Sequence, residues 1–181
     1  MRYRRVNAAG ATYFFTLVTE HRRPLFREPA AVALLLGALE KVRSHHPFEV
    51  DAYAILPDHL HALWTLPEGD ANFSTRWRLI KEAFTRAYIK THEVPQPSES
   101  RRSKGEQSIW QHRFWEHAIR DDADFAAHVD YIHINPVRHG LVTAAHDWPY
   151  STFPDWVARG NYEEWWGSAD MPPLPGWIGQ E

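Results

Sequence analysis

The chain has 181 residues, a formal net charge of −3, 44% hydrophobic residues and 14% aromatic residues. A chain of this length and composition is expected to form one domain with a real core, which excludes an intrinsically disordered protein. The absence of cysteine excludes disulfides, thiol catalysis and cysteine-ligated zinc, and it fits a cytoplasmic protein. No stretch approaches the roughly 18 apolar residues of a membrane helix, so we expect no membrane partner.

The net charge hides an asymmetry along the chain. Residues 71–120 carry ten Lys or Arg against five Asp or Glu, whereas residues 121–181 carry two against ten. A basic middle section is a suitable electrostatic footprint for phosphates. A solvated helix face accounts for the same composition equally well.

Strands and helices are predicted to alternate along the chain. β-branched and aromatic runs predict strands, which cover residues 12–19, 48–56, 59–66 and the part of 108–120 that ends at Arg120. Apolar residues at helical spacing predict helices, which cover residues 29–44, 74–91 and 121–135. We expect Ser74 to cap the second helix, and Pro136 to end the third because it disfavours helical dihedrals at Asn135.

The order β-α-β-β-α-β-α predicts an α+β fold, a ferredoxin-like or RRM-like antiparallel sheet with helices packed on one face. Residues 92–107 lack periodicity and are expected to form an exposed, mobile loop inserted in a domain over residues 1–146. Residues 147–181 are rich in Trp, Pro and acidic residues. We expect them to be an irregular C-terminal extension packed on or near the same domain.

Two histidines stand at spacing two in Pro57-Asp58-His59-Leu60-His61. On a strand, His59 and His61 project from the same face, because strand side chains alternate. Two imidazoles side by side on a half-buried strand each need a polar partner, and one metal ion satisfies both. A His-x-His pair by itself is a weak signal, and its context at the start of an apolar strand strengthens it.

Tyr131 and Asn135 stand four residues apart on the last predicted helix, so they share a face. His128 lies on the same flank, beside the buried stripe formed by Phe125, Val129 and Ile132. A helix tyrosine is more often a packed residue at the edge of a core. A flank of His, Tyr and Asn is nevertheless unusual for plain packing. With the two strand histidines it would supply a metal site and a nucleophile for breaking and rejoining DNA.

Five segments resemble one family in the same order along the chain. They are Tyr-Phe-Phe-Thr in the first strand, Leu-Pro-Asp-His-Leu-His-Ala-Leu-Trp-Thr-Leu-Pro-Glu-Gly at 56–69, Phe-Trp-Glu-His-Ala-Ile-Arg at 114–120, His-Val-Asp-Tyr-Ile-His-Ile-Asn-Pro-Val-Arg-His-Gly at 128–140 and Asp-Trp-Pro-Tyr-Ser-Thr-Phe at 147–153. Together they resemble the REP-associated tyrosine transposases, relatives of the single-tyrosine HUH transposases. The loop at 92–107 departs from the family, in which it can be shorter.

The resemblance implies a role for each of the singled-out residues. His59 and His61 are implied as metal ligands, Asn135 as a third polar ligand and Tyr131 as the single nucleophile. The implied metal is Mg²⁺ or Mn²⁺. The implied substrate is single-stranded DNA that folds into REP-type palindromic hairpins, which would associate the protein with the nucleoid. A monomer and a homodimer remain equally open.

The expected chemistry is a transesterification in which Tyr131 gives a 5′-phosphotyrosine and a free 3′-hydroxyl, with His128 as the candidate general base. Phosphate contacts are expected from the basic middle of the chain. The candidate DNA-binding residues are Arg76, Arg78, Lys81, Arg86, Lys90, Arg101, Arg102, Lys104, Arg113 and Arg120. Trp110, Phe114 and Trp115 are candidates for stacking on unpaired bases, and core packing explains each ring equally well.

Two other functions compete with this one. A non-catalytic module of the same fold that binds single-stranded DNA or RNA hairpins would leave His59, His61 and Asn135 unexplained. A metal-dependent hydrolase in which water attacks would cleave DNA without a covalent adduct at Tyr131.

Overall fold

The computed structural model describes residues 9–103, 107–168, 173–176 and 178–179. Its strands are β1 (Thr12–Val18), β2 (Glu49–Ile55), β3 (His59–Thr65) and β4 (Trp115–Ala118). Its α-helices are α1 (Pro29–His45), α2 (Phe73–Tyr88), α3 (Glu99–Arg102), α4 (Asp122–Arg138) and α5 (Phe153–Ala158). Short 3-10 helices cover Glu20–Arg22, Leu25–Arg27 and Ala145–Asp147. Within these residues, no helix combines the length and the apolar character that crossing a membrane requires.

The strands form one antiparallel sheet in the order β2-β3-β1-β4. The central strand β3 pairs with β1 in a register that sets Thr16 opposite His61 and Val18 opposite His59. The α+β class with an antiparallel sheet is therefore confirmed.

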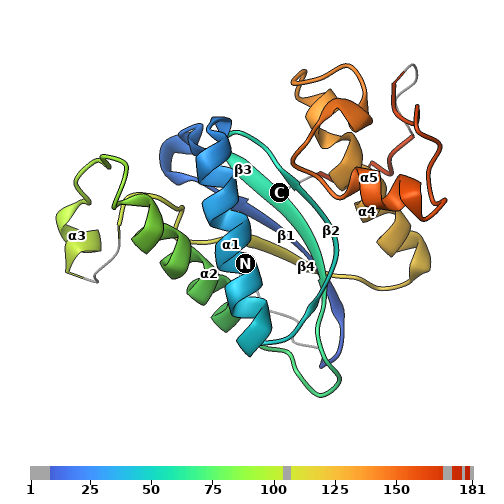
Figure 1. Ribbon diagram of the computed structural model, residues 1–181. Helices are drawn as coiled ribbons and strands as arrows, with labels where there is room; N and C mark the ends of the chain where they lie inside the picture. The colour runs from blue at the N-terminus through green and yellow to red at the C-terminus, as the bar shows by residue number, and fades with distance from the viewer. Residues whose placement is uncertain (1–8, 104–106, 169–172, 177, 180–181) are drawn as a thin grey trace.

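One face of the sheet is covered by α1 and α2 (Figure 1). The strand side chains Phe15 and Trp64 are fully buried there, and the Trp64 ring stacks on Trp77 of α2 at 3.9 Å between centroids. The N-cap of α2 is Asn72, two residues before the predicted Ser74, so the helix begins at Phe73. The Asn72 side chain accepts a hydrogen bond of 3.1 Å from Thr75 N, and Phe73 joins the core.

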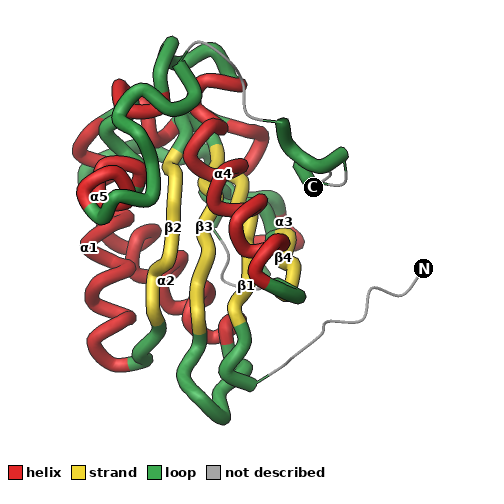
Figure 2. Tube along the Cα trace, turned by 90° about the vertical axis from the view of Figure 1, so that its right-hand side faces the viewer, coloured by secondary structure: helices red, strands yellow, loops and turns green. Residues whose placement is uncertain are grey.

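The opposite face of the sheet is covered by α4, which lies across the strands in Figure 2. The sequence expectation had the helices on one face, and the structure places them on both. The physical reason is visible in β1 and β3, where neighbouring residues such as Phe14 and Phe15 are both buried although they point to opposite faces. Val129 and Ile132 of α4 pack with Phe14 and Leu63 in a second core.

Three boundaries differ from those that the sequence predicts. The helix α4 continues past Pro136 to Arg138. Proline lacks a backbone N–H, but Pro136 lies in the last turn of the helix, where His139 N still donates to Asn135 O at 3.0 Å. The strand predicted within 108–120 is limited to β4, and Trp110 makes only an isolated bridge with Thr19. The loop at 92–107 contains the short helix α3, which the absence of periodicity had concealed.

The segment after residue 147 packs along β2 and α4. Trp148 Nε1 donates to Ile55 O at 3.0 Å, Trp156 Nε1 donates to Asp51 O at 2.9 Å, and Ser151 bridges Ala54. His133 of α4 is fully buried under this segment, with its Nε2 2.9 Å from Thr152 Oγ1. Burial lowers the pKa of His133 to about 3.

This buried histidine predicts a loss of stability in acid. With a pKa of about 3 when folded against 6.5 as an ordinary histidine, His133 takes up its proton first in the unfolded chain as the pH falls. Between about pH 6.5 and about pH 3, the protonation of this residue should therefore lower the unfolding free energy of the metal-free protein. The decrease should be about 1.4 kcal/mol for each unit by which the pH falls.

The measurement is urea denaturation in the presence of a chelator at several pH values, with His133→Gln beside the parent protein. The variant cannot take up this proton. The slope of its unfolding free energy against pH should therefore be about 1.4 kcal/mol per pH unit smaller than that of the parent protein. Other buried histidines contribute to both slopes and cancel in the comparison. Equal slopes for the two proteins would contradict the prediction.

Candidate active site

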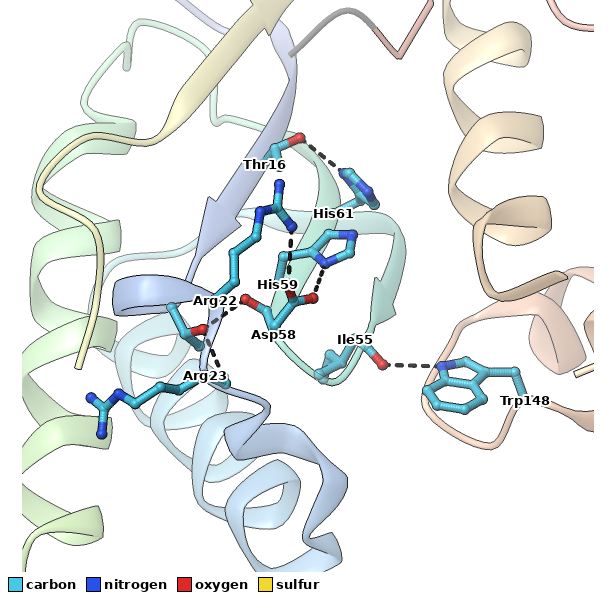
Figure 3. A network of polar contacts seen from close by, with 9 residues as sticks. Thr16, Arg22, Arg23, Ile55, Asp58, His59, His61 and Trp148 are labelled. Atoms are coloured by element: carbon cyan, nitrogen blue, oxygen red, sulfur yellow. Dashed lines mark hydrogen bonds and ion pairs between the residues drawn. The ribbon is translucent and has the colours of Figure 1, made fainter. Parts of the chain in front are cut away.

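His59 and His61 lie on the α4 side of β3, with their ring centroids 5.0 Å apart. They are 5% and 2% exposed, because β3 is a central strand and α4 covers this face. Figure 3 shows both rings turned to the same side of the strand. The alternation of strand side chains brings the two imidazoles together.

Each imidazole has a polar partner at Nδ1. His59 Nδ1 lies 2.6 Å from Asp58 Oδ1, and His61 Nδ1 lies 2.9 Å from Thr16 Oγ1 (Figure 3). Metal-ligating histidines commonly bond their other ring nitrogen in this way, which fixes the ring orientation. The pair would therefore present Nε2 to a metal ion.

Burial keeps both imidazoles neutral at neutral pH. It lowers the pKa of His61 well below its ordinary value, with further lowering from His59 and His139. It also lowers the pKa of His59, although the hydrogen bond to Asp58 acts in the opposite direction. A neutral imidazole is the form that binds metals, so desolvation prepares the pair for a cation.

The helix α4 brings Tyr131 and Asn135 to the same place. The Tyr131 and His61 ring centroids are 5.2 Å apart, and the Asn135 side chain acts on His61, where it raises the pKa against the effect of burial. Asn135 is 1% exposed, and its Oδ1 has no hydrogen-bond partner of ordinary geometry among the described residues. Two neutral imidazoles and a buried amide oxygen fit a divalent cation such as Mn²⁺.

Tyr131 is itself enclosed. Phe14 packs at 5.9 Å between centroids, and the Arg138 guanidinium lies 5.4 Å from the centroid of the Tyr131 ring. Gly179 lies against the hydroxyl group, since a Cβ placed on this glycine would be 3.2 Å from Tyr131 Oη. Gly179 therefore covers one side of the Tyr131 hydroxyl group.

His128 belongs to a second polar cluster, beside the first. Its Nδ1 lies 2.8 Å from Asp124 O and 3.2 Å from Asp124 Oδ1, and its ring stacks on His117 at 4.8 Å. The ligand atoms of His117, Asp124 and His128 lie within 4.8 Å of one another and could hold a metal ion. Burial raises the pKa of Asp124, but hydrogen bonds from Arg120 and His117 outweigh it and hold the pKa far below its usual range.

His117 and His128 of this second cluster line a cavity of about 180 Å³. Phe14, Trp115 and Arg120 complete the cavity wall, and Ile178 and Gly179 lie at its edge. Trp115 is thus the one expected stacking residue that faces the Tyr131 side of the sheet. Trp110 is instead a core residue, packed between Phe26 and Phe84 under α2, so core packing is the one of its two interpretations that the structure supports.

The candidate DNA-binding residues divide by their surroundings. Those with exposed side chains are Arg78, Arg86, Lys90, Arg102, Arg113 and Arg120. Lys81 and Arg101 are half-buried: Lys81 Nζ donates to Gln111 O at 3.0 Å, and Arg101 Nη2 pairs with Glu20 Oε2 at 2.7 Å. Lys104 lies outside the described residues. The α2 residues stand on the far side of the sheet from Tyr131 (Figure 1).

Arg76 requires a correction. It is 4% exposed, and its guanidinium bonds the carbonyl oxygens of His46, Pro47 and Asn72 and the carboxylate of Asp70 at distances of 2.7 to 3.2 Å. These partners use its hydrogen-bonding capacity inside the protein. Arg76 is therefore a structural residue that ties α2 to the end of α1.

The sequence interpretation missed several residues around the imidazoles. Asp58 directly precedes the first histidine and so was the easiest to find. His139, with its ring centroid 5.0 Å from that of His59, and Arg138 follow Asn135 at the end of α4. Arg22 gave no sequence signal at all, because its place depends on the backbone after β1.

The backbone after β1 is strained at two consecutive residues. His21 has φ 55° and Arg22 has φ 50°, a left-handed conformation that costs a residue with a Cβ about 1–2 kcal/mol. The turn delivers Arg22 Nη1 to Asp58 Oδ2 at 3.1 Å, with the Arg22 side chain 60% exposed. Burial raises the pKa of Asp58, but hydrogen bonds from His59 and Arg22 lower it overall.

Comparison with known proteins gives close relatives. A REP-associated tyrosine transposase of Escherichia coli (strain K12) is 46% identical over 164 residues, 91% of this chain and 89% of that protein. A protein named for the same family in Haemophilus influenzae (strain ATCC 51907 / DSM 11121 / KW20 / Rd) is 44% identical over 170 residues, 93% of this chain and 95% of that protein. No protein-family model matches the chain.

A solved structure of a REP-associated tyrosine transposase bound to a REP hairpin superposes with a TM-score of 0.79 at 44% sequence identity. The match covers 96% of this chain and 94% of that one. The likeness therefore extends over sequence and fold together, including the sheet and α4.

The different surroundings of Arg76 and Arg78 predict different phenotypes. Arg76→Met should lower the free energy of unfolding by about 3 kcal/mol, because it leaves Asp70 and three carbonyl oxygens without their donor. Arg78→Met on the exposed face of α2 should change it by no more than about 0.5 kcal/mol. Urea denaturation of both variants measures this, and equal destabilisation would contradict it.

Proposed function

Since the chain belongs to the family of REP-associated tyrosine transposases, we propose that it nicks and rejoins single-stranded DNA at REP-type hairpins through a 5′-phosphotyrosine. The observation that carries this proposal is the meeting of His59, His61, Asn135 and Tyr131 on one side of the sheet. The relative solved with a REP hairpin supports the choice of substrate. Such a substrate would bring the protein to the nucleoid in the cytoplasm.

The three residues that would hold a divalent ion are His59, His61 and Asn135. Their chemistry favours Mn²⁺ over Mg²⁺, because imidazole nitrogen is a poor ligand for magnesium. The bound ion would supply Lewis acidity at a phosphate oxygen. Asp58 and Thr16 would keep the rings in place through their Nδ1 atoms.

Tyr131 is proposed as the nucleophile. Its phenolic oxygen forms a bond to the phosphorus atom of the scissile phosphate, and the bond from phosphorus to the 3′-oxygen breaks. The leaving oxygen takes a proton and becomes a 3′-hydroxyl, while the 5′-phosphate stays on the tyrosine. One ester replaces another, so attack by a new 3′-hydroxyl can reverse the step without an external energy source.

His128 is proposed as the base that takes the phenolic proton. It lies one helical turn before Tyr131 on α4, and both rings pack against Phe14, at 4.7 and 5.9 Å between centroids. With Nδ1–H donating to Asp124 O, the other ring nitrogen carries the lone pair that accepts a proton. Asp124 then stabilises the imidazolium that forms, because its Oδ1 lies 3.2 Å from Nδ1.

Phosphate contacts are proposed for cations on two parts of the surface. Arg120 stands at the rim of the cavity beside Tyr131 and suits the single strand near the cut. Arg78 and Arg86 on α2 lie across the sheet, with Lys81 and Arg101 in a depression of about 470 Å³ beside them. Contacts there would hold a more distant part of the hairpin, and they would weaken with salt.

The test uses a labelled single-stranded REP-type hairpin, Mn²⁺ and a denaturing protein gel. The parent protein should give a shifted, labelled band that requires the metal. Tyr131→Phe should abolish the band, with a loss of at least about 10³-fold, because no other oxygen takes the place of the nucleophile. His59→Ala and Asn135→Ala should abolish or strongly reduce it through the loss of metal binding.

Tyr150→Phe is the matched control, a tyrosine in the segment along β2 whose side chain lies outside the site, and it should leave the band unchanged. Cleavage without a shifted band that survives Tyr131→Phe would make water the nucleophile. Binding of the hairpin without any cleavage would leave a non-catalytic binding module.

A further inference from the structure

The strained turn after β1 is held from several sides. The Thr19 hydroxyl lies 2.7 Å from Arg23 O and 2.9 Å from Asp58 O, and Arg22 N donates to Thr19 O at 3.1 Å. Glu20 N bonds Ile109 O at 2.8 Å in the segment before β4. These contacts fix a left-handed conformation that neither His21 nor Arg22 would adopt by itself.

The turn places one cation beside the candidate metal ligands. Figure 3 shows the Arg22 guanidinium next to the His59 ring, on the side of the strand to which His61 points. The charge of Arg22 is among the causes that lower the pKa of both imidazoles, so it acts on the whole pair. The side chain nevertheless remains 60% exposed.

The ion pair with Asp58 does not account for this arrangement. An exposed arginine–carboxylate pair contributes little to stability, less than two consecutive left-handed residues cost. A fixed cation next to two imidazoles also repels the metal ion that they would bind. Both features become favourable when an anion binds between the arginine and the metal ligands.

We propose that Arg22 binds a non-bridging oxygen of the scissile phosphodiester, beside the metal-binding imidazoles. A guanidinium has five N–H donors in a fork that matches phosphate oxygens. One nitrogen of Arg22 is held by Asp58, which fixes the plane of the group for its other donors. Donors fixed in advance stabilise the negative charge that builds up on these oxygens as Tyr131 attacks. This role rests on the proposed function.

The first experiment separates this role from an indirect one through Asp58. Arg22→Met, Arg22→Lys and Asp58→Asn are compared for Mn²⁺ affinity, measured from the electron paramagnetic resonance of free Mn²⁺, and for the single-turnover rate of adduct formation at saturating Mn²⁺. Arg22→Met should lower that rate about 10²-fold and leave Mn²⁺ affinity unchanged or tighter. Asp58→Asn should weaken Mn²⁺ binding at least about 10-fold.

Arg22→Lys should fall between the parent and Arg22→Met, because it keeps the charge without the fork. Arg27→Met removes an exposed charge a few residues further along the chain and should keep the parent rate. The proposal is overturned if Arg22→Met reacts at the parent rate. It is also overturned if this variant binds Mn²⁺ more weakly and added Mn²⁺ restores its rate.

Arg22→Gly gives an independent readout. Glycine adopts positive φ without strain, so this variant should unfold at the same temperature as the parent or higher while it loses the activity. A purely structural arginine would give a lower unfolding temperature, and that result would count against the proposal.

If the parent protein forms no adduct, the proposed function is contradicted, but the role of Arg22 in phosphate binding can still be tested. Arg22 is then judged by Mn²⁺-dependent binding of the hairpin, which Arg22→Met should weaken relative to Arg27→Met. Equal binding by these two variants would overturn the proposal in that case.

Discussion

The candidate active site depends on the register of β3 between β1 and β2. In this register His59 and His61 face α4, whereas Leu60 and Ala62 face α1 and α2. A slip by one residue would exchange the two sets. Such a slip is opposed from both sides of the sheet, because Phe14 pairs with Leu63 on one face and Phe15 with Ala62 on the other. The core that stabilises the sheet therefore also sets the side on which the imidazoles lie.

Burial by α4 then gives these side chains their chemistry. The helix that excludes water from His59 and His61 also carries Tyr131 and Asn135, so one packing contact both desolvates the proposed ligands and brings the proposed nucleophile to them. Desolvation keeps the imidazoles neutral, and it leaves the amide oxygen of Asn135 without an ordinary partner. A buried polar atom of this kind carries a cost that a metal ligand role would offset.

The sequence predicted the parts of this site that follow from the side-chain periodicity of a strand or helix and from the spacing of residues along the chain. The pair at 59 and 61 and the pair at 131 and 135 needed only the geometry of a strand and a helix. It did not predict that α4 lies across the sheet from α1 and α2, because a helical stripe does not say which face of a sheet it covers. Arg76 illustrates the same limit, since an arginine on a basic helix looks the same whether it is solvated or buried. Arg22 depended on two left-handed residues that no local pattern announces.

The charges around the imidazoles explain why metal and DNA would bind together. The proposed ligands themselves are neutral, and Asp58, Arg22 and His139 are among the groups that act on their pKa values. Asp58 is already paired with Arg22 and His59, so it does little to neutralise an added divalent ion. A cation in this site would keep an uncompensated positive charge that attracts an anion. In the proposed reaction a DNA phosphate would supply that anion, and each partner would then raise the affinity of the other.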